Sequence, residues 1–240
     1  MRKTLALLTL IAPLTLVGCA NSSSTDIETH GMYADFHASA DGTGNTTVYA
    51  ALKVGGSTSN DFVDVVGDDS LIGTHAATAQ PMSKQEFLGA VWYTTVFAVD
   101  SAGAPFKISL NRGASHVSAP NSDATLPAPF SITAPAGGAT FSRATAAIPL
   151  TWSSSGGTDP MNYVASGDCI VAKSDTLPAD NGSYTIPAGS IQPGQNQTGT
   201  SCQVTISISR NRAGIIDSAY GEGGAFTATQ TRSVTVLSAP

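Results

Sequence analysis

Charged side chains are scarce in this chain. Asp, Glu, Lys and Arg make up 12% of its 240 residues, roughly half their share in an ordinary globular domain. The formal net charge is −6, and the few basic residues form no cluster. Without a basic patch a protein cannot hold a phosphate backbone by charge. We therefore expect no nucleic-acid partner.

The chain also lacks an apolar run long enough to cross a bilayer as a helix, for which roughly 18 residues are needed. Its N-terminal run, Leu5 to Val17, has 13 residues and follows Arg2 and Lys3. A positive start before a short apolar run is typical of an export signal that is removed. We predict a signal peptide over residues 1–18. The remaining residues 19–240 carry a formal charge of −8, because the signal holds two basic residues and no acidic ones.

The end of that run, Leu16-Val17-Gly18-Cys19, resembles the lipobox of bacterial lipoproteins at all four positions. The resemblance implies a diacylglyceryl thioether (palmitate-type acylation) on Cys19, cleavage before it, and acylation of the new amine. It also implies a lipid anchor in the cell envelope. The outer membrane is favoured if the host is Gram-negative, because Ala20 and not Asp follows the cysteine. The alternative is an ordinary secretory signal with a chance cysteine near its cleavage site.

Cysteine is rare as well, with three in the whole chain. Once Cys19 carries lipid, Cys169 and Cys202 remain. An even pair in an exported chain predicts a disulfide, because the compartment outside the cytoplasm is oxidising. The alternative, a metal or redox pair, has no CxxC spacing and no nearby His to support it.

Serine, threonine and glycine take the place of charge, with 56 Ser plus Thr and 24 Gly. Apolar residues alternate with polar ones over much of residues 27–112, which predicts half-buried strands and an all-β fold. The strands so predicted begin near Met32, Val48, Phe62, Val91 and Phe106. A capping-box spacing from Ser83 to Glu86 predicts a single helical turn. The expected organisation is a lipidated tether over 19–26, a β-sandwich-like domain over 27–112, a Pro-rich linker over 113–129 and a second domain over 130–240.

The second domain opens with Phe130 to Pro135 and then Ile148-Pro149-Leu150-Thr151-Trp152. These segments resemble the first strands of fibronectin type III and related immunoglobulin-like modules, in which a buried Trp closes an early strand. The resemblance implies an immunoglobulin-like β-sandwich, so the expected fold is two such sandwiches. It departs from the family at Cys169, which follows Trp152 where the immunoglobulin disulfide has its first cysteine before the Trp.

Catalytic and metal-binding motifs are sparse. The segment Gly113-Ala114-Ser115-His116-Val117 comes nearest to a nucleophile elbow but lacks the final Gly. The His residues show no zinc spacing, although His37 and His75 fall on predicted strand faces and could meet across a sheet. A group of acidic residues on a Gly-containing turn could supply oxygen ligands to calcium. The alternative is that these residues stabilise the hairpin turns. Those residues are Asp61, Asp64, Asp68 and Asp69. We expect no cofactor, no metal site and no enzyme activity.

The outward-facing aromatics offer a candidate binding site. Tyr33 and Tyr49 alternate onto the outer side of their strands, and Trp92 lies on the face opposite Tyr93. Four arginines, at positions 143, 210, 212 and 232, are expected to pair with Asp217, Glu222 and their neighbours. The function that these observations favour is a non-catalytic binding or structural role, in which sandwich loops and sheet edges meet another envelope protein. The alternatives are a glycan-binding module and, third, a hydrolase.

Overall fold

The computed structural model describes residues 20–178 and 180–240, and it is built almost entirely of β-strands. Signal residues 1–18 and Cys19 lie outside the described residues. Two short 3-10 helices, η1 (Ser24–Asp26) and η2 (Thr29–Gly31), precede the first long strand. The expectation of an all-β chain built of β-sandwiches is confirmed.

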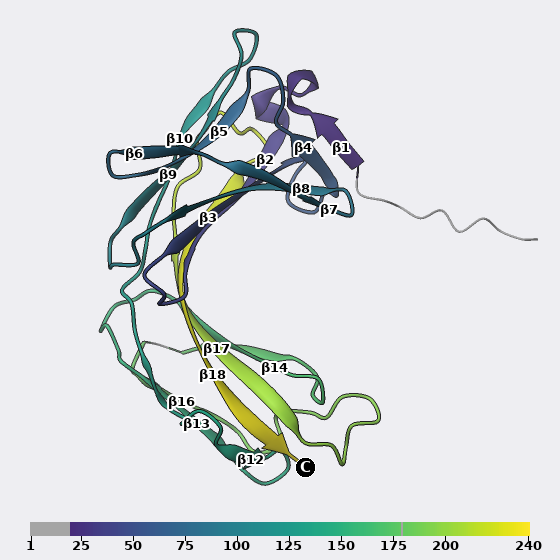
Figure 1. Ribbon diagram of the computed structural model, residues 1–240, viewed down its shortest axis with the longest axis vertical. Coiled ribbons are helices and arrows are strands. Elements are labelled where there is room, and N and C mark those ends of the chain that lie inside the picture. The colour runs from purple at the N-terminus through teal and green to yellow at the C-terminus, as the bar shows by residue number, and fades with distance from the viewer. Residues whose placement is uncertain (1–19, 179) are drawn as a thin grey trace, which may run out of the picture.

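One large sheet, called sheet A here, runs through the whole molecule (Figure 1). Its strands in spatial order are β1 (Ala20–Ser23), β4 (Asp61–Asp64), β3 (Thr46–Val54), β2 (Met32–Ala40), β18 (Gly224–Ala239), β17 (Cys202–Ala213), β14 (Met161–Ser166) and β15 (Lys173–Leu177). Off this path, β8 (Ala90–Phe97) pairs with β3 and with β7 (Ser83–Phe87), and β12 (Thr140–Ser142) pairs with the end of β18.

Two smaller sheets cover the two halves of sheet A. Sheet B is made of β10 (Ala119–Thr125), β9 (Pro105–Asn111), β5 (Ser70–His75) and β6 (Thr78–Pro81). Sheet C is made of β11 (Ile132–Ala134), β13 (Ile148–Trp152) and β16 (Ser183–Ile186). Sheets B and C lie on the outer side of a crescent, and sheet A follows its inner curve (Figure 1). Each half is therefore a two-layer sandwich with its own core.

Strand β18 belongs to both sandwiches. Residues Gly224–Gln230 pair in parallel with β2, while Thr227–Ser238 pair with β17. At about 3.3 Å per residue, a 16-residue strand spans roughly 50 Å, which is enough to run through two small cores. Phe226 and Ala228 accordingly lie in the first core, and Val236 lies in the second.

The domain boundaries expected from the sequence are therefore wrong at the C-terminal side. Tyr220 and Phe226 pack edge-to-face on Phe36, each with ring centroids 5.9 Å away. The first sandwich is thus completed by residues that follow the second sandwich in the chain. The predicted linker over 113–129 is also wrong in part, because Ala119–Thr125 forms strand β10 at the edge of sheet B.

The predicted flexible tether is wrong for residues 20–26. β1 pairs in parallel with β4, and the Ser22 hydroxyl donates to the Asp61 carboxylate at 2.9 Å. Ser24 is fully buried. A Ser/Thr-rich segment becomes ordered here because the neighbouring sheet supplies partners for its backbone and hydroxyl groups.

A buried arginine ties this N-terminal segment to sheet B. The Arg112 Nε donates to Asp69 at 2.9 Å, and the other guanidinium nitrogens donate to the Ile27 carbonyl and the Thr29 hydroxyl. Burial alone would raise the pKa of the Asp69 carboxyl, but the hydrogen bond from the Gly113 amide and the Arg112 charge hold it below its usual value. Arg112 and Asp69 are both charged and hydrogen-bonded, so removal of either partner leaves the other as a buried charge without a counter-charge.

A second buried arginine lies where the two sandwiches meet. The Arg210 guanidinium contacts the Asp180 carboxylate at 2.8 Å, and both side chains are inaccessible to solvent. It also donates to the carbonyl of Ala128 and lies over the Phe130 ring at 4.9 Å. Residues 128–130 connect the sandwiches, so Arg210 holds the connector against the second sandwich.

Asp180 also accepts hydrogen bonds from other residues of the second sandwich. It accepts from the Trp152 indole at 2.8 Å and from the Ser155 amide at 3.0 Å. Burial raises its pKa, but these hydrogen bonds and Arg210 outweigh burial and lower the pKa to about 2. Trp152 is buried at the end of β13, as its resemblance to the fibronectin type III strand predicts.

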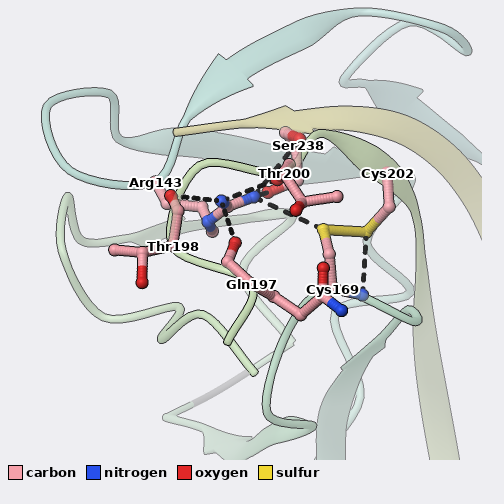
Figure 2. Close-up of a disulfide and its surroundings, with 7 residues drawn as sticks. All are labelled: Arg143, Cys169, Gln197, Thr198, Thr200, Cys202 and Ser238. Atoms are coloured by element: carbon pink, nitrogen blue, oxygen red, sulfur yellow. Dashed lines mark hydrogen bonds between the residues drawn. A yellow bond between two sulfur atoms is a disulfide. The ribbon is translucent and has the colours of Figure 1, made fainter. Parts of the chain in front are cut away.

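The remaining arginines also pair, but with partners other than Asp217 and Glu222. Arg212 makes two bonds to the Asp159 carboxylate, at 2.9 and 2.7 Å. Arg143 is shown in Figure 2: its guanidinium donates to the Ser238 hydroxyl, to the Thr200 carbonyl and to the Cys169 sulfur. The expected pairing of the arginines with Asp217 and Glu222 is therefore wrong. Their partners are mostly backbone carbonyls, or carboxylates such as Asp159 that lie far away in the sequence.

The predicted disulfide between Cys169 and Cys202 is present, with Cα atoms 5.8 Å apart. It joins the loop after β14 to the first residue of β17 (Figure 2), so both cysteines belong to one end of sheet A. Its position differs from that of an immunoglobulin disulfide, which crosses between the two sheets. Together with Arg143 it fixes the loop over residues 194–201 to the sheet.

We predict that residues 20–129 do not fold alone, because β2 then loses its β18 partner and the core loses Tyr220 and Phe226. An amide NMR spectrum of this fragment is expected to show poor dispersion. Fusing residues 214–231 after residue 129 through a Gly/Ser linker restores the missing strand, so this matched variant should give a dispersed spectrum. A folded 20–129 fragment would contradict the shared-strand architecture.

We also predict that Asp180 makes the fold acid-sensitive. Its folded pKa of about 2 lies below the ordinary 3.8, so it stabilises the fold above about pH 4. That contribution, on the order of 2 kcal/mol, is lost as the pH falls toward 2. In Asp180→Asn the unfolding free energy should fall by about 3–5 kcal/mol at pH 7, because Arg210 loses its counter-charge. Urea titrations at pH 7, 4 and 2.5 measure both effects, and an unchanged acid slope in the variant would contradict this role.

Candidate binding surface

The side of sheet A that faces away from both cores is continuous across the two sandwiches. We call it the outer face of sheet A, and it lines the inner curve of the crescent (Figure 1). Alternation along β18 places Phe226, Ala228 and Val236 in the cores and their neighbours on this face. The outer face is carried by Tyr33, Asp35, His37, Ser39, Thr47, Tyr49, Thr205, Ser207, Ser209, Thr227, Thr229, Thr231, Ser233 and Thr235.

Its C-terminal half is a ladder of paired hydroxyl groups between β17 and β18. Ser207 meets Ser233 at 2.8 Å, and Ser209 meets Thr231 at 2.9 Å. The ladder continues where the Thr229 hydroxyl donates to Asn211 at 3.0 Å. Cross-strand hydroxyl pairs of this kind stabilise a sheet and hold one another's rotamers. The result is a regular polar surface with few charges.

Its N-terminal half carries the aromatic side chains. His37 Nε2 donates a hydrogen bond to the Asp35 carboxylate at 3.0 Å, and the His37 ring lies 5.6 Å from that of Tyr49. The His37 bond lowers the pKa of Asp35, with smaller contributions from the His37 and Lys53 charges, against the opposing effect of burial. Burial raises the pKa of Tyr49, and the Asp35 charge adds to that effect.

The two tyrosines predicted as a binding site, Tyr33 and Tyr49, both lie half-buried on this face. The register pairs Tyr49 with Thr94 of β8 and with His37 of β2, and Trp92 stands two residues from Thr94 on the same side. The aromatics thus share one side of three neighbouring strands. What sequence reasoning missed is the hydroxyl ladder beside them. Alternation shows which residues point outward, but not that β17 and β18 place those residues opposite one another.

A shallow hollow lies on the same face where the two sandwiches meet. It is lined by Ser39, Asp41 and Asn45 around the β2–β3 turn and by Thr231 of β18. Asp41 is the one charged residue in this lining, and hydrogen bonds from Thr43 lower its pKa. This hollow continues the outer face of sheet A across the junction.

Ser115 and His116, the residues of the segment nearest to a nucleophile elbow, are in contact in the structure. The Ser115 hydroxyl and His116 Nδ1 are 2.9 Å apart, and His116 Nε2 lies 3.8 Å from Glu28. The two residues are adjacent in one tight turn, closed by a bond from the His116 amide to Gly113. Ser115 is exposed, and the Glu28 distance is too long for a hydrogen bond. The pair is explained by local turn geometry.

The acidic residues considered for calcium are engaged separately. Asp61 accepts from Ser22, Asp64 accepts from Lys84 and Tyr93, and Asp69 is paired with Arg112. Within residues 20–178 and 180–240, no group of three His, Cys, Asp or Glu side chains could hold a metal ion. His37 and His75 lie on different sheets, so the idea that they meet across a sheet is wrong.

The comparisons with known proteins do not assign the chain to a family. No protein-family model and no curated protein matches the chain. Among solved structures, the FN1–FN3 domains of chicken CNTN1 align with a TM-score of 0.27 and 8% identity, covering 93% of this chain and 69% of that one. The adhesin InvE of Yersinia pseudotuberculosis aligns with a TM-score of 0.24 and 14% identity, covering 87% of this chain and 59% of its own length. In the part of the chain described, no helix is long and apolar enough to cross a membrane.

Proposed function

We propose that the chain is a lipid-anchored envelope protein with a non-catalytic binding role, and that the outer face of sheet A receives its partner. The observation that supports this most is the continuity of that face over two sandwiches joined by β18. A surface built on strands is rigid, so a partner loses little free energy in ordering it. The extent of the face fits another envelope protein better than a small molecule.

The anchor in this proposal is Cys19, through the lipobox at Leu16–Cys19. Because β1 begins at Ala20 and is paired with β4, no flexible spacer would separate the lipid from the first sandwich. The protein would therefore sit directly on the lipid surface. The outer membrane is the favoured location if the host is Gram-negative.

A glycan is the second candidate partner, and a specific observation favours it. Tyr33, Tyr49 and Trp92 share one side of sheet A beside a hydroxyl-rich surface. Planar aromatic rings can stack on sugar rings, while hydroxyl and carboxylate groups such as Asp35 can bond the sugar hydroxyls. Sugar recognition would be confined to the first sandwich, whereas a protein partner would use the face in both.

For the anchor, we predict that Cys19→Ser moves the protein from the membrane fraction to the soluble fraction of the envelope. Mass spectrometry of the N-terminal peptide should show acyl chains on the wild-type chain and none on the variant. Cys169→Ser is the matched control, because it alters a disulfide cysteine and should leave the protein in the membrane fraction. Membrane retention of Cys19→Ser after a salt wash would contradict the lipid anchor.

For the binding surface, we predict that a photo-crosslinking amino acid at Thr229 captures a discrete partner in living cells. The same group at Thr78 of β6, on sheet B, is the matched control and should capture none. A protein adduct at Thr229 only supports the proposal, and equal adducts or none at either site oppose it. Isolated cell-wall glycan is the alternative ligand to test. If the protein binds it, and Tyr33→Ala and Tyr49→Ala abolish that binding without lowering the melting temperature, the partner is a glycan.

A further inference from the structure

The hairpin of β7 and β8 ends in two large apolar residues that nothing covers. Phe87 is 67% exposed and Leu88 is 80% exposed. They are the one adjacent pair among the large exposed hydrophobic residues of the described chain. Isolated surface hydrophobics are ordinary, but an adjacent pair at the very tip of a projecting hairpin is an unusual place for them.

The conformation of this tip makes the choice of leucine more telling. Phe87 pairs with Ala90, so the turn consists of Leu88 and Gly89, with φ angles of 48° and 81°. A two-residue turn with positive φ at both positions favours Asn-Gly, and a bulky side chain is disfavoured there. Leu88, at the first turn position, thus exposes an apolar side chain to water and adopts a positive φ that leucine disfavours. Such a local violation points to a function outside the fold.

The hairpin is held firmly beside the start of the described chain. Lys84 of β7 bonds Asp64 of β4 at 2.8 Å, and the Tyr93 hydroxyl of β8 bonds Asp64 at 3.1 Å and the Val65 amide at 2.7 Å. Strand β4 pairs with β1. In Figure 1 the β7–β8 hairpin and strand β1 lie on the same side of the first sandwich.

We propose that the Phe87–Leu88 tip inserts into the interfacial layer of the bilayer next to the lipid on Cys19, and so orients the first sandwich on the membrane. The position of the anchor identifies the occupant as lipid, because Cys19 directly precedes Ala20, the first residue of β1, and consecutive Cα atoms lie only about 3.8 Å apart. This inference rests on the proposed anchoring at Cys19. Aromatic and aliphatic side chains bury favourably at the acyl boundary, while Lys84 and Glu86 stay paired behind them at 3.3 Å.

The test uses residues 19–240 tethered to vesicles of phosphatidylethanolamine and phosphatidylglycerol through a maleimide lipid. With Cys169 and Cys202 joined, Cys19 is the free thiol, so the tether holds whether or not cells lipidate this residue. Leu88→Trp reports on the tip, and Ile215→Trp, at a residue that is 71% exposed elsewhere on the same sandwich, is the matched control. Brominated phospholipids should quench the added emission at position 88 by about half or more and leave that at 215 nearly unchanged.

Equal quenching at both positions would overturn the proposal. A dimer would also overturn it. In that case the Leu88→Trp variant would sediment as a dimer and show blue-shifted emission without vesicles, because a second copy of the chain would cover the tip. The Leu88→Asn variant is expected to fold, because Asn-Gly suits this turn, and its melting temperature should be equal or higher. Its effect on membrane insertion can therefore be measured. In untethered Cys19→Ser chain, adding Leu88→Asn should reduce the rise in surface pressure of a phospholipid monolayer at least threefold. An unchanged rise would count against insertion by the tip.

Discussion

The sharing of β18 between two cores is the constraint on which the rest of the molecule depends. Its first half is a central strand of the first sandwich, and its second half is a strand of the second. A central strand cannot be removed without exposing backbone donors and acceptors on both sides. Neither sandwich therefore has a closed boundary in the sequence, and the chain behaves as one structural unit although it has two hydrophobic cores.

Buried arginines make this arrangement rigid where apolar contact alone would leave a hinge. Arg210 and Arg112 each use several guanidinium donors, on a carboxylate and on carbonyls of a segment without regular structure. A flat group with five donors can satisfy an irregular connector in a way that an aliphatic side chain cannot. Both sites are costly to desolvate, so they act less as a source of stability than as a means of selecting one arrangement of the segments. Arg143 plays the same part at the disulfide, where it gathers carbonyls of residues 197, 198 and 200.

The sequence predicted those elements whose burial is one-sided. Strand β2 alternates cleanly between buried and outward-facing residues, and alternation places Tyr33 on its outer face correctly. The assignment failed where partners decide the outcome. Pro120 argued for a linker, yet β10 tolerates it because the register shifts between Ala119 and Ser122 at the sheet edge. Ser83 and Glu86 have helix-cap spacing, but β8 pairs with this segment and makes it a strand. Residues 20–26 have the composition of a linker, and a neighbouring strand with Arg112 behind it orders them.

The same limit explains why the binding surface was only half predicted. Outward-facing tyrosines can be recognised from alternation within one strand, as Tyr33 and Tyr49 were. The hydroxyl ladder requires knowledge that Ser207 faces Ser233 and that Ser209 faces Thr231, a register set by the whole length of β17 and β18. Because that register also carries β18 from one core into the other, the constraint that joins the sandwiches is the one that makes their outer faces a single surface. A one-residue slip would turn every hydroxyl of β18 toward the cores, so the core contacts of Phe226 and Val236 are what keep this surface polar.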